Sequence, residues 1–297
     1  MDFRLDQDQR DLVRGVRELL AGRFGREALR AAVDAGGSGD GDGSGDGRLD
    51  RGLWKELGDA GFFALRLPEE RGGVGLGLPE AVLVFEEAGR ALLPGPLVAT
   101  HVAAGSVPGA AEGAVVVTEV SPEGLVPWLE AADVVLGAAE GAVPVRSVDP
   151  LTPLHRVPGT GEWAPETVLL TAAEQVGTAA WCTDAAVAYA TRREQFGQVI
   201  GGFQAVKHLC AGMLVRTELA RAAVHGAAVT ADPVEIAGAK LLADEAAVAN
   251  ARDCLQVHGG MGFTWEADVH LHLKRAWVRA ALVLPGDRAA EEVAAAL

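Results

Sequence analysis

Two adjacent arginines and two phenylalanines lie among glycines in one short stretch of the chain, residues 189–208. The guanidinium groups of Arg192 and Arg193 have the fork geometry that binds two phosphate oxygens at once. Phe196 and Phe203 could stack on a planar ring or fill the seam between two helices. These residue types predict a site for a phosphorylated, aromatic ligand at a helix-turn-helix junction. An ordinary helix hairpin that ends in a glycine cap is the alternative.

A second glycine-rich loop follows a long alanine-rich helix about fifty residues later. Residues 254–266 read Cys-Leu-Gln-Val-His-Gly-Gly-Met-Gly-Phe-Thr-Trp-Glu, and residues 53–62 near the N-terminus read Leu-Trp-Lys-Glu-Leu-Gly-Asp-Ala-Gly-Phe. Together with residues 189–208, these segments resemble the acyl-CoA dehydrogenase family. Its members are flavoproteins that oxidise the bond between the α and β carbons of acyl thioesters. The resemblance covers both ends of the chain well and the middle poorly.

The resemblance implies a set of FAD-binding residues at the two glycine-rich loops. In the family's motif, the matching positions lie against the pyrophosphate and adenosine part of FAD; here they are Arg193, Gln195, Phe196, Gln256 and Gly260. In the family these positions reach across a dimer interface to a cofactor whose flavin ring sits in the neighbouring subunit. The resemblance therefore implies that this chain keeps the half-site that it would lend to another subunit.

The half-site for the chain's own flavin ring and the catalytic base are harder to find. Of the family's flavin-cradling motifs, only residues 118–124, Thr-Glu-Val-Ser-Pro-Glu-Gly, are recognisable. The family's usual base, a glutamate after the second glycine loop, corresponds by offset to Val283. Some members place the base near the start of the first C-terminal helix, where Thr167 stands at the matching offset. Glu166 is the candidate there, although one step along a helix rotates a side chain by about 100°.

The alternative for Glu166 is a carboxylate that interacts with the dipole at the start of a helix. Glu174 lies two turns further along the same predicted helix.

Composition limits the possible partners and location of the chain. It has 297 residues, 49% of them hydrophobic, and a formal net charge of −15, which argues against nucleic acid or an anionic membrane as a partner. No stretch is apolar enough for a membrane span and no secretory signal is recognisable, so a cytoplasmic location is expected. Cys182, Cys210 and Cys254 lack metal-ligand spacing and are expected to be small buried side chains.

The pattern of hydrophobic residues predicts a helical N-terminal domain at residues 1–112. Amphipathic helices are expected at 6–21, 22–34 and 49–61, with a further helix that ends near Arg90. Residues 36–47 are glycine and aspartate apart from two serines, and we expect a mobile loop there. A calcium site in that loop is disfavoured, because the twelfth position counted from Asp40 is Arg51 rather than a bidentate glutamate.

The amino-acid composition of the rest of the chain changes at two points, near residues 113 and 166. Residues 113–165 carry short β-branched runs at 114–118, 134–137 and 142–145, which predict a shortened middle β domain. Residues 166–297 are rich in alanine and predict a C-terminal four-helix bundle, with helices at 167–193, 203–231, 234–257 and 267–284. Trp265 and Trp277 are expected to pack within that bundle. The predicted fold is mainly α with a small β domain, as in acyl-CoA dehydrogenases, and oligomerisation through the bundle is expected.

Two functions follow from these observations and the resemblance. In the first, the chain works as an FAD-dependent subunit that desaturates an acyl-CoA or acyl-carrier thioester, within a homo- or hetero-oligomer that contains another acyl-CoA dehydrogenase subunit. In the second, it is a non-catalytic partner without flavin chemistry of its own. The weak flavin cradle and the missing glutamate at Val283 favour activity only in a hetero-oligomer. No metal ion is expected to take part.

Overall fold

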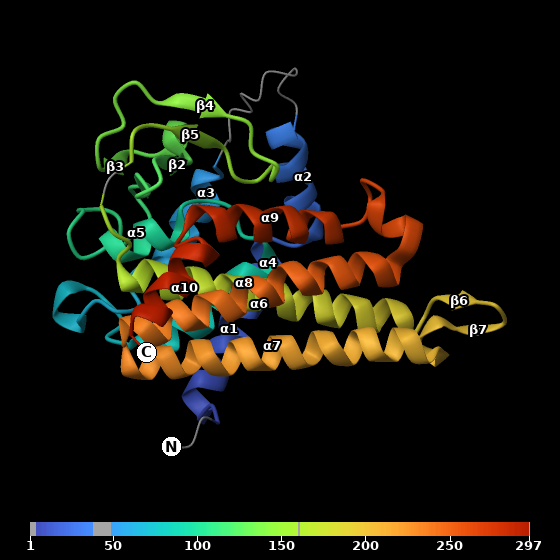
Figure 1. The fold of residues 1–297 in the computed structure, drawn as a ribbon. Helices are drawn as coiled ribbons and strands as arrows, with labels where there is room; N and C mark the ends of the chain where they lie inside the picture. Colours follow the sequence, from blue (N-terminus) through green and yellow to red (C-terminus); the bar gives the residue numbers. More distant parts are fainter. Residues whose placement is uncertain (1–3, 38–48, 160, 297) are drawn as a thin grey trace. The chain divides into compact units, whose positions relative to one another are not determined.

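The computed structural model describes residues 4–37, 49–159 and 161–296. It consists mainly of helices, with short strands between the N-terminal helices and the long C-terminal ones (Figure 1). The mainly α fold with a small β region agrees with the fold class predicted from the sequence. Contacts divide the chain into two compact units, with division points inside two helices. The first unit comprises Met1–Val84 and Leu93–Leu170, and the second comprises Phe85–Leu92 and Thr171–Leu297.

The first unit begins with helices that pack around aromatic side chains. Its helices are α1 (Gln7–Arg23), α2 (Arg26–Gly37), α3 (Arg51–Asp59), the 3-10 turn η1 (Glu69–Arg71), the first half of α4 (Leu78–Ala91) and α5 (Leu97–Ala103). A capping box starts α1, because Asp6 and Gln9 each accept a hydrogen bond from the other's backbone N–H. Trp54 and Phe63 are fully buried, with ring centroids 4.6 Å apart. This aromatic pair anchors α3 in the core of the unit.

The strands of the first unit form two very small sheets. They are β1 (Val117–Glu119), β2 (Leu125–Pro127), β3 (Val134–Leu136), β4 (Val143–Val145) and β5 (Leu154–Arg156), with the 3-10 turn η2 (Leu129–Ala131) between β2 and β3. Strand β1 pairs with β3 in parallel, and β5 lies between β2 and β4 in an antiparallel sheet. The sequence pattern predicted β1, β3 and β4 but not β2 or β5.

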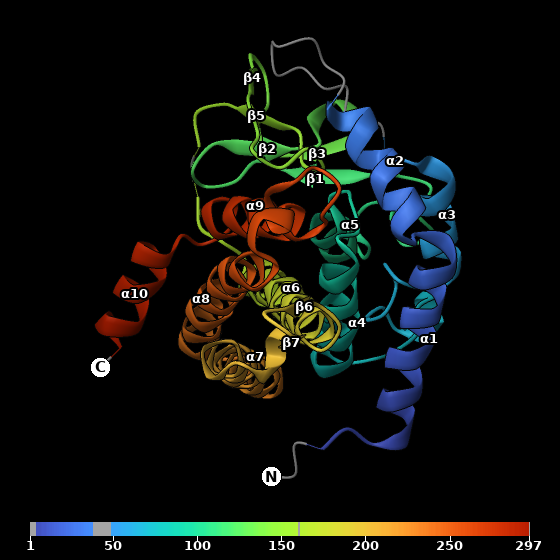
Figure 2. The same ribbon diagram turned by 90° about the vertical axis from the view of Figure 1, so that its right-hand side faces the viewer.

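The second unit is dominated by long alanine-rich helices, which Figure 2 shows nearly end-on. Its elements are the second part of α4 (from Phe85), α6 (Pro165–Ala190, from Thr171), β6 (Glu194–Gln195), β7 (Gln198–Val199), η3 (Ile200–Gly202), α7 (Gln204–Thr230), α8 (Pro233–His258), η4 (Gly259–Phe263), α9 (Val269–Leu282) and α10 (Gly286–Ala295). The Asp232 side chain accepts from two N–H groups at the start of α8, and Pro233 follows at the first helical position. The four long helices match the four that the sequence predicts to within three residues at every end.

A buried polar cluster fixes α6, α7 and α8 against one another. The Asn250 amide nitrogen donates to Met213 O and Thr217 Oγ1, both at 2.9 Å, and to Thr183 Oγ1 at 3.2 Å. Its oxygen accepts from Arg216 Nε at 2.8 Å. Because Asn250 is fully buried, these bonds favour one register of the three helices.

Some expectations need correction. Trp265 and Trp277 do not pack inside the bundle: they are 49% and 40% exposed. The sequence pattern also missed α5 and α10. Residues 36 and 37 belong to α2, and the rest of the predicted mobile loop, with its candidate calcium position, lies outside the described residues.

Candidate functional site

The first glycine-rich segment forms a hairpin directly after α6. The backbone N–H of Arg193 donates to Tyr189 O at 2.9 Å, and its carbonyl accepts from Ile200 N at 2.8 Å. The Arg193 side chain is exposed, and no described residue forms a hydrogen bond or ion pair with its guanidinium. Phe196 sits at the hairpin tip with φ of 54° and is 91% exposed, touching Phe203 edge-on at 6.2 Å. The hairpin therefore presents an unpaired cation and an aromatic ring to solvent.

The second glycine-rich segment begins in the last turn of α8. Gln256 is exposed there, and Gly259 ends the helix with φ of 59°, which favours glycine. A Cβ atom added to Gly260 would meet nothing within 4 Å in the described part of the chain. The backbone of this loop is therefore open to a ligand.

A ring stack joins the two segments. Tyr189, near the end of α6, stacks on His258, the last residue of α8, with ring centroids 4.1 Å apart and an interplanar angle of 25°. The five predicted cofactor residues lie in the last turn of α8 or just after the ends of α6 and α8, so the structure places both of their segments at one end of the second unit (Figure 1). No local sequence pattern indicates this pairing, because its two members lie far apart in the chain and meet only through helix packing.

The residues at this end fit the dinucleotide part of FAD. An unpaired guanidinium suits a diphosphate, an exposed ring suits the adenine base, and the open space at Gly260 lets a ligand approach the backbone closely. Residues 118–124 do not fit the flavin ring. Thr118 Oγ1 donates to Pro127 O at 2.5 Å, and a Cβ atom on Gly124 would lie 2.0 Å from Val157 O. That segment is therefore packed against its own neighbours in the first unit.

Glu166, the candidate base, is held by an arginine and a histidine in the first unit. Its carboxylate forms an ion pair with Arg66 and lies 3.6 Å from His101 Nε2. Burial raises the pKa of Glu166, but hydrogen bonds and charge from His101 and Arg66 outweigh it and lower the pKa to about 2. Such a carboxylate is a weak proton acceptor. Val283, at the family's usual base position, is buried and caps the end of α9.

Glu174 is a second carboxylate of α6 that an arginine holds. Its Oε1 accepts from Arg279 Nη2 at 2.7 Å within the second unit, and both side chains are buried. Burial raises the pKa of Glu174, and the nearby Arg279 and Arg275 offset only part of that effect. This ion pair joins α6 to α9 and was not predicted from the sequence.

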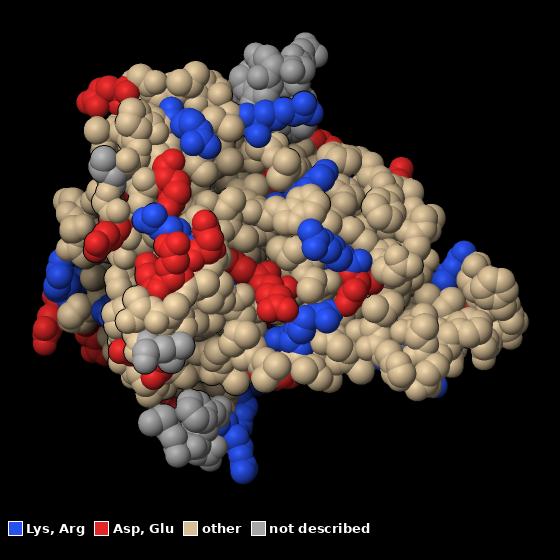
Figure 3. Space-filling view, viewed as in Figure 1, with Lys and Arg blue, Asp and Glu red and all other residues tan. Residues whose placement is uncertain are grey.

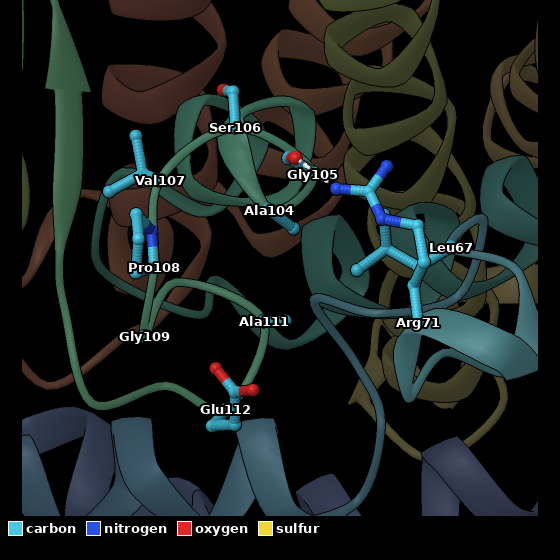
Figure 4. Close-up of a pocket in the computed structure, with 10 residues that line it drawn as sticks. All are labelled: Leu67, Arg71, Ala104, Gly105, Ser106, Val107, Pro108, Gly109, Ala111 and Glu112. Atoms are coloured by element: carbon cyan, nitrogen blue, oxygen red, sulfur yellow. Dashed lines mark hydrogen bonds between the residues drawn. The ribbon is translucent and has the colours of Figure 1, made fainter.

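A small pocket opens in the first unit (Figure 4). Arg71, Ser106 and Glu112 line it, and the Arg71 guanidinium donates to the Gly105 carbonyl. Its volume of about 170 Å³ is below the ~300 Å³ at which small-molecule sites usually begin. We therefore assign it no ligand.

Neither a metal-binding cluster nor a membrane-spanning helix is found among the described residues. Among the described side chains, no group of three His, Cys, Asp or Glu is arranged to hold a metal ion. Within the same ranges, no helix is long and apolar enough to cross a membrane. Basic and acidic side chains are interspersed on the face drawn in Figure 3.

Comparison with known proteins identifies the class to which this arrangement belongs. Residues 7–113 match the acyl-CoA dehydrogenase N-terminal domain, and residues 167–285 match the acyl-CoA dehydrogenase C-terminal domain. The chain belongs to the acyl-CoA dehydrogenase family, FAD-dependent oxidoreductases that act on CH–CH bonds.

Individual relatives resemble the chain over almost its whole length. It is 36% identical to the acyl-CoA dehydrogenase IpdE2 of Mycolicibacterium smegmatis, an alignment that covers 94% of this chain and 95% of the relative. Two solved structures share the fold at 22% identity. A variant of the Tcur3481–Tcur3483 steroid ACAD has a TM-score of 0.84, with 97% of each chain covered. The ChsE4–ChsE5 complex of Mycobacterium tuberculosis has a TM-score of 0.79, with 99% of this chain and 98% of that chain covered.

Proposed function

We propose that this chain is a subunit of a hetero-oligomeric acyl-CoA dehydrogenase and lends a half-site to the FAD of a neighbouring subunit. The half-site consists of Arg193, Gln195, Phe196, Gln256 and Gly260. The substrate is an acyl thioester, carried on CoA or on a carrier protein. The similarity to IpdE2, and to chains of the Tcur3481–Tcur3483 and ChsE4–ChsE5 assemblies, supports an assembly with a second dehydrogenase subunit.

The observation that carries this proposal is that the hairpin exposes an aromatic ring and an arginine with which no described residue pairs. Elsewhere in the second unit, arginines such as Arg216, Arg221 and Arg279 are paired with carboxylates. The guanidinium of Arg193 has no such partner among the described residues, although the chain carries a net charge of −15. Phe196 adopts an unfavourable positive φ and buries almost nothing. Both features are explained if a ligand on another subunit completes the contacts.

The chemistry divides between the chain and its neighbour. A bound FAD would supply the hydride acceptor for the β carbon of the acyl thioester, and a carboxylate would take the α proton. This chain's residues bind and orient the diphosphate and adenosine end of the cofactor. Because Arg66 and His101 hold Glu166 as a weakly basic carboxylate, we assign the α-proton transfer to a carboxylate of the neighbouring subunit. Glu166 then serves to fix the start of α6 in the first unit.

A second candidate function is that of a partner that supports the assembly without contacting FAD. The buried Val283 at the usual base position and the closed packing at Gly124 favour it, because both remove parts that the chain's own flavin chemistry would need. The two candidates differ in whether the hairpin contributes to FAD affinity.

The test is the FAD content and affinity of the purified assembly. We expect the chain co-expressed with a neighbouring dehydrogenase subunit to retain FAD, and Arg193→Ala to weaken FAD binding by about 10- to 100-fold, the effect of a lost charge-assisted hydrogen bond. The matched control is Arg192→Ala, because Arg192 Nε already donates to Ala188 O at 2.9 Å. Unchanged FAD affinity in Arg193→Ala would support the second candidate. A chain that purifies alone with stoichiometric FAD and turns over an acyl-CoA would contradict both.

A further inference from the structure

His258 lies between two residues of the proposed half-site, two positions after Gln256 and two before Gly260. Its Nδ1 is 2.8 Å from the backbone oxygen of Cys254 and 3.7 Å from the Cys254 sulfur. No described residue forms a hydrogen bond or ion pair with the other ring nitrogen, Nε2. The ring is thus anchored on one side and has an unused polar atom on the other.

The hydrogen bond at Nδ1 decides what the free nitrogen can do. A carbonyl oxygen can only accept, so Nδ1 carries the proton in the neutral ring and Nε2 is then a lone-pair acceptor. An acceptor repels the oxygens of a phosphate. Protonation of the ring turns Nε2 into a charged N–H donor, which attracts them.

Tyr189 connects this ring to the arginine hairpin. Its carbonyl accepts from the backbone N–H of Arg192 at 3.1 Å and of Arg193 at 2.9 Å, while its ring stacks on His258. The same residue therefore sets the position of the arginine turn through its main chain and that of the imidazole through its side chain. The stack fixes the spacing between the cationic hairpin and the glycine loop.

We propose that His258 is a further cofactor-binding residue of this half-site, whose imidazolium presents Nε2–H to the diphosphate of the dinucleotide, with Tyr189 as the residue that positions it. The proposal rests on the proposed function, because it assigns a role within the same half-site. It adds a proton to the binding reaction: the anion binds to the protonated ring, so cofactor binding takes up a proton wherever His258 is neutral in the free assembly.

The groups around the ring determine the pH range of this effect. They are Cys254 and Asp253 on α8, Tyr189 and Cys182 on α6, and Cys210 on α7. Burial lowers the pKa of His258, but hydrogen bonds and charge from Cys254 outweigh it and raise the pKa above 6.5. The pKa of Cys254 is lowered to about 6, first by a hydrogen bond from Cys182 and then by His258, against burial. The Cys254 sulfur lies 3.7 Å from Nδ1 of the ring, and its charge when ionised favours the imidazolium.

The direction of the pH dependence follows. FAD affinity is greatest below the pKa of His258 and falls as pH rises through it, by about tenfold in total if the neutral ring binds no better than an uncharged side chain. The diphosphate itself does not change charge in this range, so the dependence belongs to the protein.

The experiment measures FAD affinity of the whole assembly by flavin fluorescence between pH 6 and pH 8.5, for wild type and variants of this chain. We expect His258→Gln, which stays neutral, to bind FAD about tenfold more weakly at pH 6 and to lose most of the pH dependence. Tyr189→Phe keeps the stack and should match wild type, whereas Tyr189→Leu should weaken binding severalfold. His258→Gln with an unchanged pH profile would overturn the proposal.

A second measurement covers the case in which a variant does not fold. The His258 ring proton of the wild-type assembly is titrated by NMR with and without ADP, and its pKa should rise when ADP binds; an unchanged value would refute the contact. Arg193→Ala separates this inference from the proposed function. If Arg193→Ala weakens FAD binding and His258→Gln does not, only the role of His258 fails. If neither does, the half-site itself fails.

Discussion

Replacing Glu166 by glutamine tests the electrostatic description of the start of α6. The pKa of this carboxyl falls from 4.5 to about 2 in the folded chain, which makes the ionised form about 3 kcal/mol more favourable there. A folded-state pKa below the unfolded value stabilises the protein above pH 4.5, and this stabilisation is lost as pH falls through 2. Glu166→Gln should therefore destabilise the chain by about 2–3 kcal/mol at pH 7, because the amide keeps one acceptor but not the charge.

The assay is urea unfolding of wild type and variant at two pH values, followed by circular dichroism. The difference between wild type and variant in the free energy of unfolding should shrink to roughly 1.5 kcal/mol at pH 3, because Glu166 of the wild type is then mostly protonated in the unfolded state, and only the interval down to its folded-state pKa of about 2 still contributes. Glu162→Gln is the matched control, since Glu162 is exposed and lies one turn earlier in sequence. A difference at pH 7 below about 0.5 kcal/mol would refute the reasoning, because it would equal that of an ordinary surface substitution. Loss of acyl-CoA turnover in the assembly, with FAD binding and stability intact, would restore Glu166 as the catalytic base.

Three further sets of substitutions test the packing of the second unit by urea unfolding. Gly177→Ala should destabilise the unit by about 2 kcal/mol or more, since the new Cβ would lie 1.9 Å from a carbonyl of α4. Gly226→Ala is the control and should stabilise the unit by about 0.5–1 kcal/mol, because no described atom beyond the adjoining backbone of its own helix lies within 4 Å of its new Cβ. Equal effects of the two substitutions would show that α4 and α6 do not meet so closely. Asn250→Ala should cost about 3 kcal/mol, because it removes buried hydrogen bonds between three helices and one from an arginine; a loss under 1 kcal/mol would contradict that. Lys240→Met alone should lower the free energy of unfolding by about 3–5 kcal/mol, because it leaves Asp244 buried without its ion-pair partner. Adding Asp244→Leu should restore most of this loss. If the second change does not restore stability, the ion pair itself stabilises the unit.

Helix prediction succeeded where the sequence pattern is long and failed for the short helices α5 and α10. The four long C-terminal helices are alanine-rich over more than a dozen residues each, and glycines or a proline mark several of their ends. Helix α5 was missed because Leu97–Ala103 is short and nearly all buried, so it has no polar face to reveal a helical period. Strands β2 and β5 were missed because a three-residue strand carries too little alternation to recognise.

Some residues of the candidate site stand in local sequence motifs, whereas other features of the site depend on contacts between distant parts of the chain. Arg193 and Gly260 stand in local motifs, and the sequence could identify them one segment at a time. The partners of Glu166 are remote: Arg66 comes from the loop after α3 and His101 from α5, the helix that the pattern missed. The stack of Tyr189 on His258 depends on how α6 packs against α8. No spacing rule encodes such contacts, so the pKa of Glu166 and the role of His258 needed the fold.

The arrangement of the second unit explains how a chain can lose part of the chemistry and keep a cofactor half-site. The family's usual base position, Val283, caps the end of α9, whereas the hairpin and the glycine loop follow the ends of α6 and α8. The Tyr189–His258 stack and the bonds of Asn250 hold α6 and α8 without any contribution from Val283. A valine there packs as a small apolar cap and leaves these contacts unchanged. The residue at position 283 can therefore vary without altering the ends of α6 and α8, as the proposed sharing of one FAD site between two subunits requires.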